Sequence, residues 1–145
     1  MDAPLVLRWG PTYYSLIAVL LTLGLVALVA GAGVRRPLDI AVVCVLPLML
    51  AGTSLLCARQ LSRRLAKALP LMKIVWTASI GVLAHGVLAL TLMAISYANG
   101  ATFGSVETTN LIFALVEVPI GIMLVILSGG LMRRARQLVR DGVLS

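Results

Sequence analysis

Four long stretches of this chain carry almost no charged side chains, and they limit the folds that are open to it. They lie at about residues 11–33, 40–58, 74–97 and 108–132. Each is close to the ~20 residues that a helix needs to cross the ~30 Å hydrocarbon layer of a bilayer. Their apolar residues do not alternate with polar ones, as the strands of a membrane barrel require. The sequence therefore predicts an all-α integral membrane protein, a bundle of four transmembrane helices.

The composition favours one membrane domain that takes in residues 1–145. Hydrophobic residues make up 61% of the 145 residues and charged residues 12%, a balance that ordinary water-soluble domains do not show. The first apolar run is longer than the core of a signal peptide and no cleavage motif follows it, so we expect it to remain as a span. Little sequence is left for a soluble catalytic domain, and we expect no enzymatic activity.

The basic residues fall almost entirely on one side of the four expected spans. Of the twelve, only Arg35 and Arg36 lie in the short turn on the other side. Positively charged loops stay in the cytoplasm, so both termini and the loop between the second and third spans are expected there. Arginine outnumbers lysine, and the spans are rich in Ala, Leu and Val. That composition favours a bacterial source and hence a multi-pass protein of the cytoplasmic (inner) membrane.

Two basic segments are expected to lie along the cytoplasmic headgroups. The linker 59–72 places Leu61, Leu65 and Leu69 four residues apart, which predicts a short amphipathic helix that continues the second span. The tail 133–145 carries a similar stripe that ends near Gly142. Seven basic side chains are expected to contact anionic lipid headgroups or a partner protein: Arg59, Arg63, Arg64, Lys67, Arg133, Arg134 and Arg136. Because they belong to no folded soluble module, we expect no nucleic-acid binding.

Two titratable side chains interrupt the apolar runs, His85 in the third and Glu117 in the fourth. Such groups are costly in hydrocarbon and usually mark a functional or packing site. At 1.5 Å per residue, His85 lies ~18 Å from Lys73, and Glu117 lies ~24 Å from Arg133, about one helical turn nearer the outside. These depths permit a contact between the two side chains but do not require one.

Small and polar residues form a stripe on each of these two helices. The stripes are Asn110, Ala114, Glu117, Gly121 and Ser128 on residues 108–132, and Ala78, Gly81, His85 and Ala89 on residues 74–97. Membrane helices pack through such stripes, so both titratable groups are expected to point into the protein. The hypothesis is an intramembrane polar site made of His85, Glu117, Asn110 and Ser128. Pro47 and Pro119 are expected to break their helices near it.

No cofactor and no metal site is expected, since one histidine cannot supply two axial haem ligands within one chain. The favoured function is a non-catalytic integral or accessory subunit of a larger membrane complex, with membrane lipids and other subunits, or copies of itself, as partners. An alternative is a homo-oligomeric transporter or channel for protons or cations that uses Glu117 with His85. A second alternative is a holin-like pore former.

Overall fold

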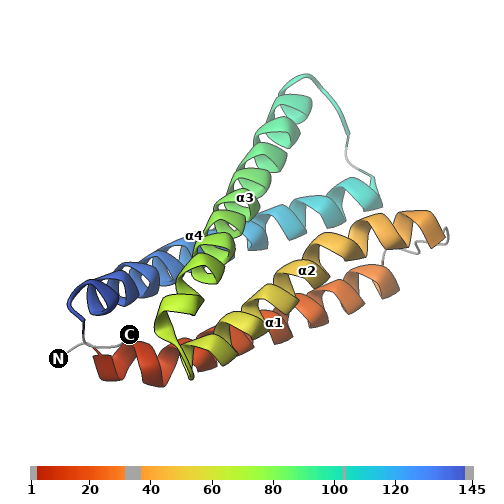
Figure 1. Ribbon diagram of the computed structural model, residues 1–145. Coiled ribbons are helices and arrows are strands. Elements are labelled where there is room, and N and C mark those ends of the chain that lie inside the picture. The colour runs from red at the N-terminus through yellow and green to blue at the C-terminus, as the bar shows by residue number, and fades with distance from the viewer. Residues whose placement is uncertain (1–2, 32–36, 103, 143–145) are drawn as a thin grey trace. The chain divides into compact units, whose positions relative to one another are not determined.

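Four α-helices joined by short turns make up the described part of the chain (Figure 1). The computed structural model describes residues 3–31, 37–102 and 104–142, without the side chains of residues 3–5, 28, 31, 37–44, 46, 105–107 and 109–110. The helices are α1 (Ala3–Gly31), α2 (Pro37–Leu61), α3 (Leu65–Ala98) and α4 (Ser105–Arg140). No strand occurs over the described ranges, so the prediction of an all-helical chain is confirmed.

Three of these helices hold segments that are long and apolar enough to cross a membrane. The segments are Val6–Ala27 in α1, Leu65–Ala98 in α3 and Leu111–Arg140 in α4. The predicted span 40–58 falls within α2, whose side chains at residues 40–44 and 46 are not described. The four-span topology expected from the sequence stays a prediction.

The helices extend beyond the predicted spans into the basic segments. α1 begins at Ala3 rather than near residue 11, α3 begins at Leu65 rather than near 74, and α4 continues to Arg140. The predicted limits of the spans were set where the hydropathy of the sequence falls. The helices continue past those limits because backbone hydrogen bonds also form through charged residues. At 1.5 Å per residue α3 and α4 are about 50 Å long, more than the ~30 Å of hydrocarbon. Each helix is therefore longer than such a layer is thick, and its basic residues lie in the turns at one end.

The linker 59–72 does not form the single short helix that was predicted. α2 ends at Leu61, where the amide groups of Arg63 and Arg64 donate to the carbonyl of Gln60 at 3.0 and 2.7 Å. The chain then turns, and α3 begins at Leu65. Leu61 and Leu65 are both buried on either side of this turn. Burying both leucines favours the turn over a helix lying along the headgroups.

Pro47 and Pro119 do not end their helices, and the kink expected at each proline stays a prediction. α2 continues through Pro47 and α4 continues through Pro119. A proline removes one helical hydrogen bond. Ending the helix would free several more backbone groups, which have no water to bind in an apolar layer.

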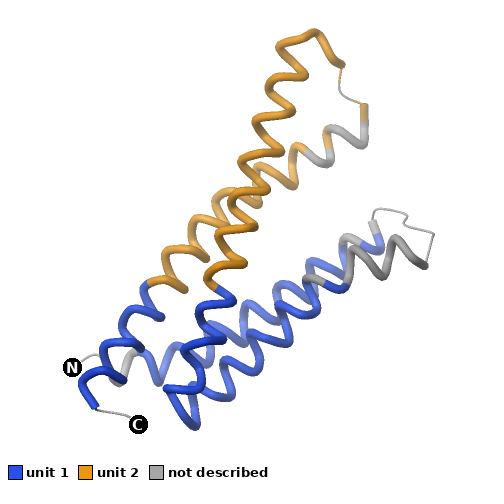
Figure 2. The backbone as a smooth tube through the Cα atoms, turned by 45° about the horizontal axis from the view of Figure 1, so that its top comes forward, with its two compact units in different colours: residues 1–75, 130–145 blue, residues 76–129 orange. Residues whose placement is uncertain are grey.

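The chain divides into two compact units (Figure 2). Unit 1 is residues 1–75 and 130–145, and unit 2 is residues 76–129. In unit 1, α1 and α2 lie side by side, and the first turns of α3 and the last turns of α4 belong to the same unit. Its buried side chains are Val6, Tyr14, Ile17, Ala18, Leu25, Ala51, Ser54, Cys57, Ala58, Leu61, Leu65, Ala68, Met72, Val75, Met132, Ala135 and Leu138. The tail stripe predicted to end near Gly142 is present here, since α4 ends at Arg140 and buries Ala135 and Leu138.

Candidate intramembrane polar site

In unit 2, α3 and α4 run antiparallel and approach each other closely through glycines. A Cβ atom built at Gly121 would lie 3.0 Å from the Cα atom of Leu83, and one built at Gly86 would lie 3.1 Å from a methyl of Val118. Nearer the other end of the unit, a Cβ at Gly129 would lie 2.9 Å from the indole nitrogen of Trp76. As the residue number rises from Trp76 to Leu83 to Gly86 on α3, the number of the residue in contact on α4 falls, as expected for antiparallel helices. The lack of a side chain at these glycines permits the close approach.

His85 on α3 and Glu117 on α4 meet within this interface. The Nδ1 atom of His85 lies 3.0 and 3.1 Å from the two carboxyl oxygens of Glu117. Gly86 positions the pair, because a Cβ at Gly86 would lie 3.4 Å from both Cβ and Cγ of Glu117. The sequence left this contact open, and the structure contains it.

The two side chains differ sharply in exposure. The side chain of His85 is 72% exposed and that of Glu117 is 26% exposed. The expectation that both groups point into the protein is therefore wrong for His85. The face of α3 that packs on α4 carries Leu83 and Gly86, two residues beyond Gly81 and one residue beyond His85 of the predicted stripe. His85 lies at the edge of this interface and reaches sideways to the carboxylate.

The other predicted site residues do not join the pair. Ser128 is buried, but it follows Glu117 by eleven residues, or ~16 Å along the helix. The side chain of Asn110 lies outside the described residues. Ala114 and Gly121 are buried, so the stripe predicted on α4 does face its neighbour. The site that the structure brings together is His85 with Glu117.

Hydroxyl groups elsewhere in the apolar segments do not form hydrogen bonds between helices among the bonds described below. Thr22, Thr53 and Thr91 each donate to the carbonyl four residues earlier in the same helix, at 2.8 Å. In unit 1, the hydroxyls of Tyr14 and Ser54 are buried and accept or donate no hydrogen bond within the described part of the chain. The threonines need no second helix, whereas the His85–Glu117 pair requires α3 and α4 to be held in register.

Sequence reasoning missed Gly86, which lies beside the pair and is buried. The sequence feature that could have identified Gly86 is its place directly after the one histidine of the chain. The predicted stripe included Gly81 instead, which is exposed and has nothing within 4 Å of a built Cβ. Gly81 and His85 thus lie on an open face of α3.

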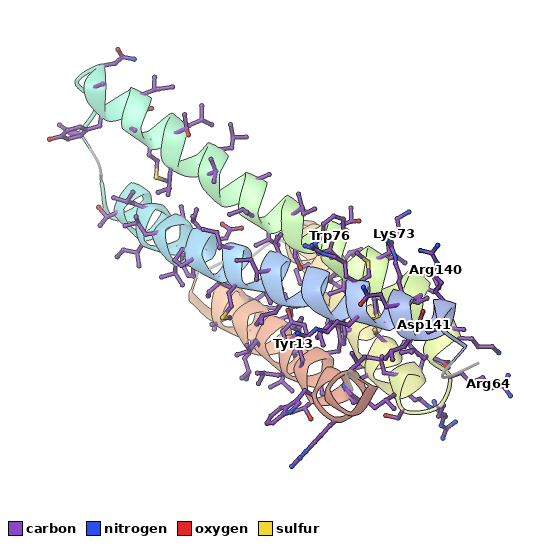
Figure 3. All side chains as sticks on the ribbon, turned by 90° about the vertical axis from the view of Figure 1, so that its left-hand side faces the viewer. Tyr13, Arg64, Lys73, Trp76, Arg140 and Asp141 are labelled. Atoms are coloured by element: carbon purple, nitrogen blue, oxygen red, sulfur yellow. The ribbon has the colours of Figure 1, made fainter. Side chains whose placement is uncertain are left out.

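The basic segments form a second feature, confined to unit 1. Arg64, Lys73, Arg140 and Asp141 all lie toward the same end of this unit (Figure 3). The described basic side chains of these segments are all exposed: Arg59, Arg63, Arg64, Lys67, Lys73, Arg133, Arg134, Arg136 and Arg140. Here this set is named the basic end. The fold brings the linker and the tail together, although about sixty residues of sequence separate them.

No group of three or more metal-binding side chains occurs among the residues that the structure describes. His85 and Glu117 are two potential ligands, fewer than a structural metal site uses. Comparisons with protein families, with curated proteins and with solved structures find nothing that matches this chain.

Proposed function

We propose that this chain is a non-catalytic integral subunit of a larger membrane complex. In this proposal it crosses a bacterial inner membrane four times, with both termini and the basic end in the cytoplasm. The helices of unit 2 supply a surface for a partner helix, and the basic end contacts anionic lipid headgroups.

The observation that carries the proposal is the exposure of His85 within the apolar helix α3. Its side chain is 72% exposed, and neighbouring apolar side chains on α3 such as Leu88 and Leu92 are also exposed. A polar ring facing lipid is unfavourable, so such residues are usually covered by protein. Gly81, one turn away, leaves room for another backbone to approach. A helix packed on this face would remove His85 from lipid.

The basic end supports the proposed orientation. Its exposed arginines and lysines terminate apolar helices, and the carboxylate described among them is Asp141. Basic side chains at the ends of spans favour the cytoplasmic side and attract anionic headgroups. The partner helix would then pack within the membrane rather than on a soluble domain.

The test is to purify the tagged chain from its native membrane in mild detergent and to weigh the complex by native mass spectrometry. We expect at least one other membrane protein in fixed stoichiometry. Gly81→Leu should remove that partner because the new side chain fills the open face. Gly24→Leu is the matched control, since Gly24 on α1 is equally open, and it should keep the partner.

Two results would count against the proposal. One is a preparation that contains only copies of this chain. The other is a partner that stays bound to Gly81→Leu as tightly as to the wild type.

A further inference from the structure

The His85–Glu117 pair is isolated from other titratable groups. Within unit 2, residues 76–98 of α3 and residues 105–129 of α4 pack around it, and the other titratable side chain described on these residues is Tyr97. Tyr97 follows His85 by twelve residues, or ~18 Å along the helix. Among the side chains described in unit 2, no further charged group is present to compensate a net charge on the pair.

The geometry distinguishes the two nitrogens of the imidazole ring. Nδ1 lies within 3.1 Å of both carboxyl oxygens of Glu117. No hydrogen bond joins Nε2 to the described part of the chain, and the side chain is 72% exposed. The bond made by one ring nitrogen sets the tautomer of the other. Nδ1 is held by Glu117, which leaves Nε2 as the atom open to exchange.

The protonation states of the pair differ in whether Nε2 carries a hydrogen. With one proton bound the pair is neutral, either as imidazolium with carboxylate or as imidazole with carboxylic acid. In both forms Nε2 carries a hydrogen, because Nδ1 faces the carboxyl group. When that proton passes to a water molecule at the exposed edge of the ring, the Nε2–H electron pair stays on nitrogen. Any proton on the carboxyl group moves to Nδ1, Nδ1–H donates to the carboxylate, and the pair becomes a monoanion. A net charge is far more costly than a neutral pair in an apolar segment.

We propose that the His85–Glu117 pair is an intramembrane proton-binding site that takes up and releases one proton through Nε2 of His85. His85 binds the proton. Glu117 is a positioning residue that fixes the ring and balances its charge. The inference goes beyond the proposed function and concerns the chain by itself, in which no partner helix covers the His85 ring.

The test uses the one histidine of the chain, which gives a single set of imidazole signals. The full chain is labelled with isotopic nitrogen at histidine, reconstituted into bilayers, and followed by solid-state NMR as the pH is changed. We expect Nε2 to lose its proton at high pH while Nδ1 keeps its own. Glu117→Leu should abolish the preference for Nδ1–H. Glu107→Leu, at the other glutamate of α4, should leave it unchanged.

A neutral ring that keeps its proton on Nε2 and loses it from Nδ1 would overturn the proposal. So would a ring whose protonation never changes over the pH range in which the helices persist. Both outcomes are read from the wild-type spectrum, so the test stands even where Glu117→Leu fails to insert.

Discussion

Single glycines decide how closely α3 and α4 pack. Gly121 on α4 meets the backbone of Leu83, with 3.0 Å from a built Cβ to the Cα atom. Gly81 on α3 meets nothing within 4 Å. A backbone neighbour cannot rotate away as a side chain can, so the two glycines tolerate substitution differently. The pair of positions offers a matched test of the interface.

We predict that Gly121→Ala destabilises the isolated chain by about 1–3 kcal/mol, the usual range for overpacking. Gly81→Ala should be neutral or stabilising by up to ~1 kcal/mol, since alanine favours helix over glycine. Unfolding by denaturing detergent in mixed micelles measures both. Equal effects of the two substitutions would show that α3 and α4 do not pack as described.

The sequence predicted one face of this interface and missed the other. On α4 the spacing of Ala114, Gly121 and Ser128 identified the buried side. On α3 the predicted stripe through His85 and the packing face through Gly86 lie one position apart, or 100° around the helix. Periodicity cannot choose between such neighbouring faces. Contacts with α4 do so, because Leu83 and Gly86 fit against Gly121 and Val118.

At the scale of elements, the helices are longer than the apolar runs that predicted them. α3 begins in the basic linker and α4 ends in the basic tail, so both carry charged turns beyond their apolar runs. The sequence predicted where the apolar runs lie and where α4 ends. It did not predict the turn at residues 62–64, because the leucine spacing continues across it. Only tertiary burial of Leu61 and Leu65 selects the turn.

We predict that the basic end enriches anionic lipid around the protein. Replacing Arg133, Arg134 and Arg136 together by glutamine should lower the anionic share of the lipid that co-purifies. Each charge removed should weaken the association with anionic lipid by up to ~1 kcal/mol. Mass spectrometry of the co-purified lipid measures that share. Replacing Arg35 and Arg36, on the opposite side in the proposed topology, is the control. An unchanged share in the triple variant, or an equal loss in the control, would contradict the assignment.

At the scale of the whole molecule, the proposed function depends on where the chain crosses the membrane. Three helices are long and apolar enough to cross, and the fourth crossing is assigned to α2 by the sequence of residues 40–58. Four crossings return the chain to the side where it began. In the proposed topology the basic end lies in the cytoplasm, and the turn between α3 and α4 lies outside. The same topology places His85 and Glu117 between these levels, within the apolar layer.

Labelling of single cysteines by a membrane-impermeant maleimide tests this arrangement most directly. In a background that lacks Cys44 and Cys57, Ala101→Cys lies in the turn between α3 and α4. Arg63→Cys and Asp141→Cys lie at the two parts of the basic end. In intact right-side-out vesicles we predict labelling of Ala101→Cys alone, with the other two labelled only after the membrane is permeabilised. Labelling of Ala101→Cys and Arg63→Cys from the same side would contradict the account, because α3 would then not cross the membrane.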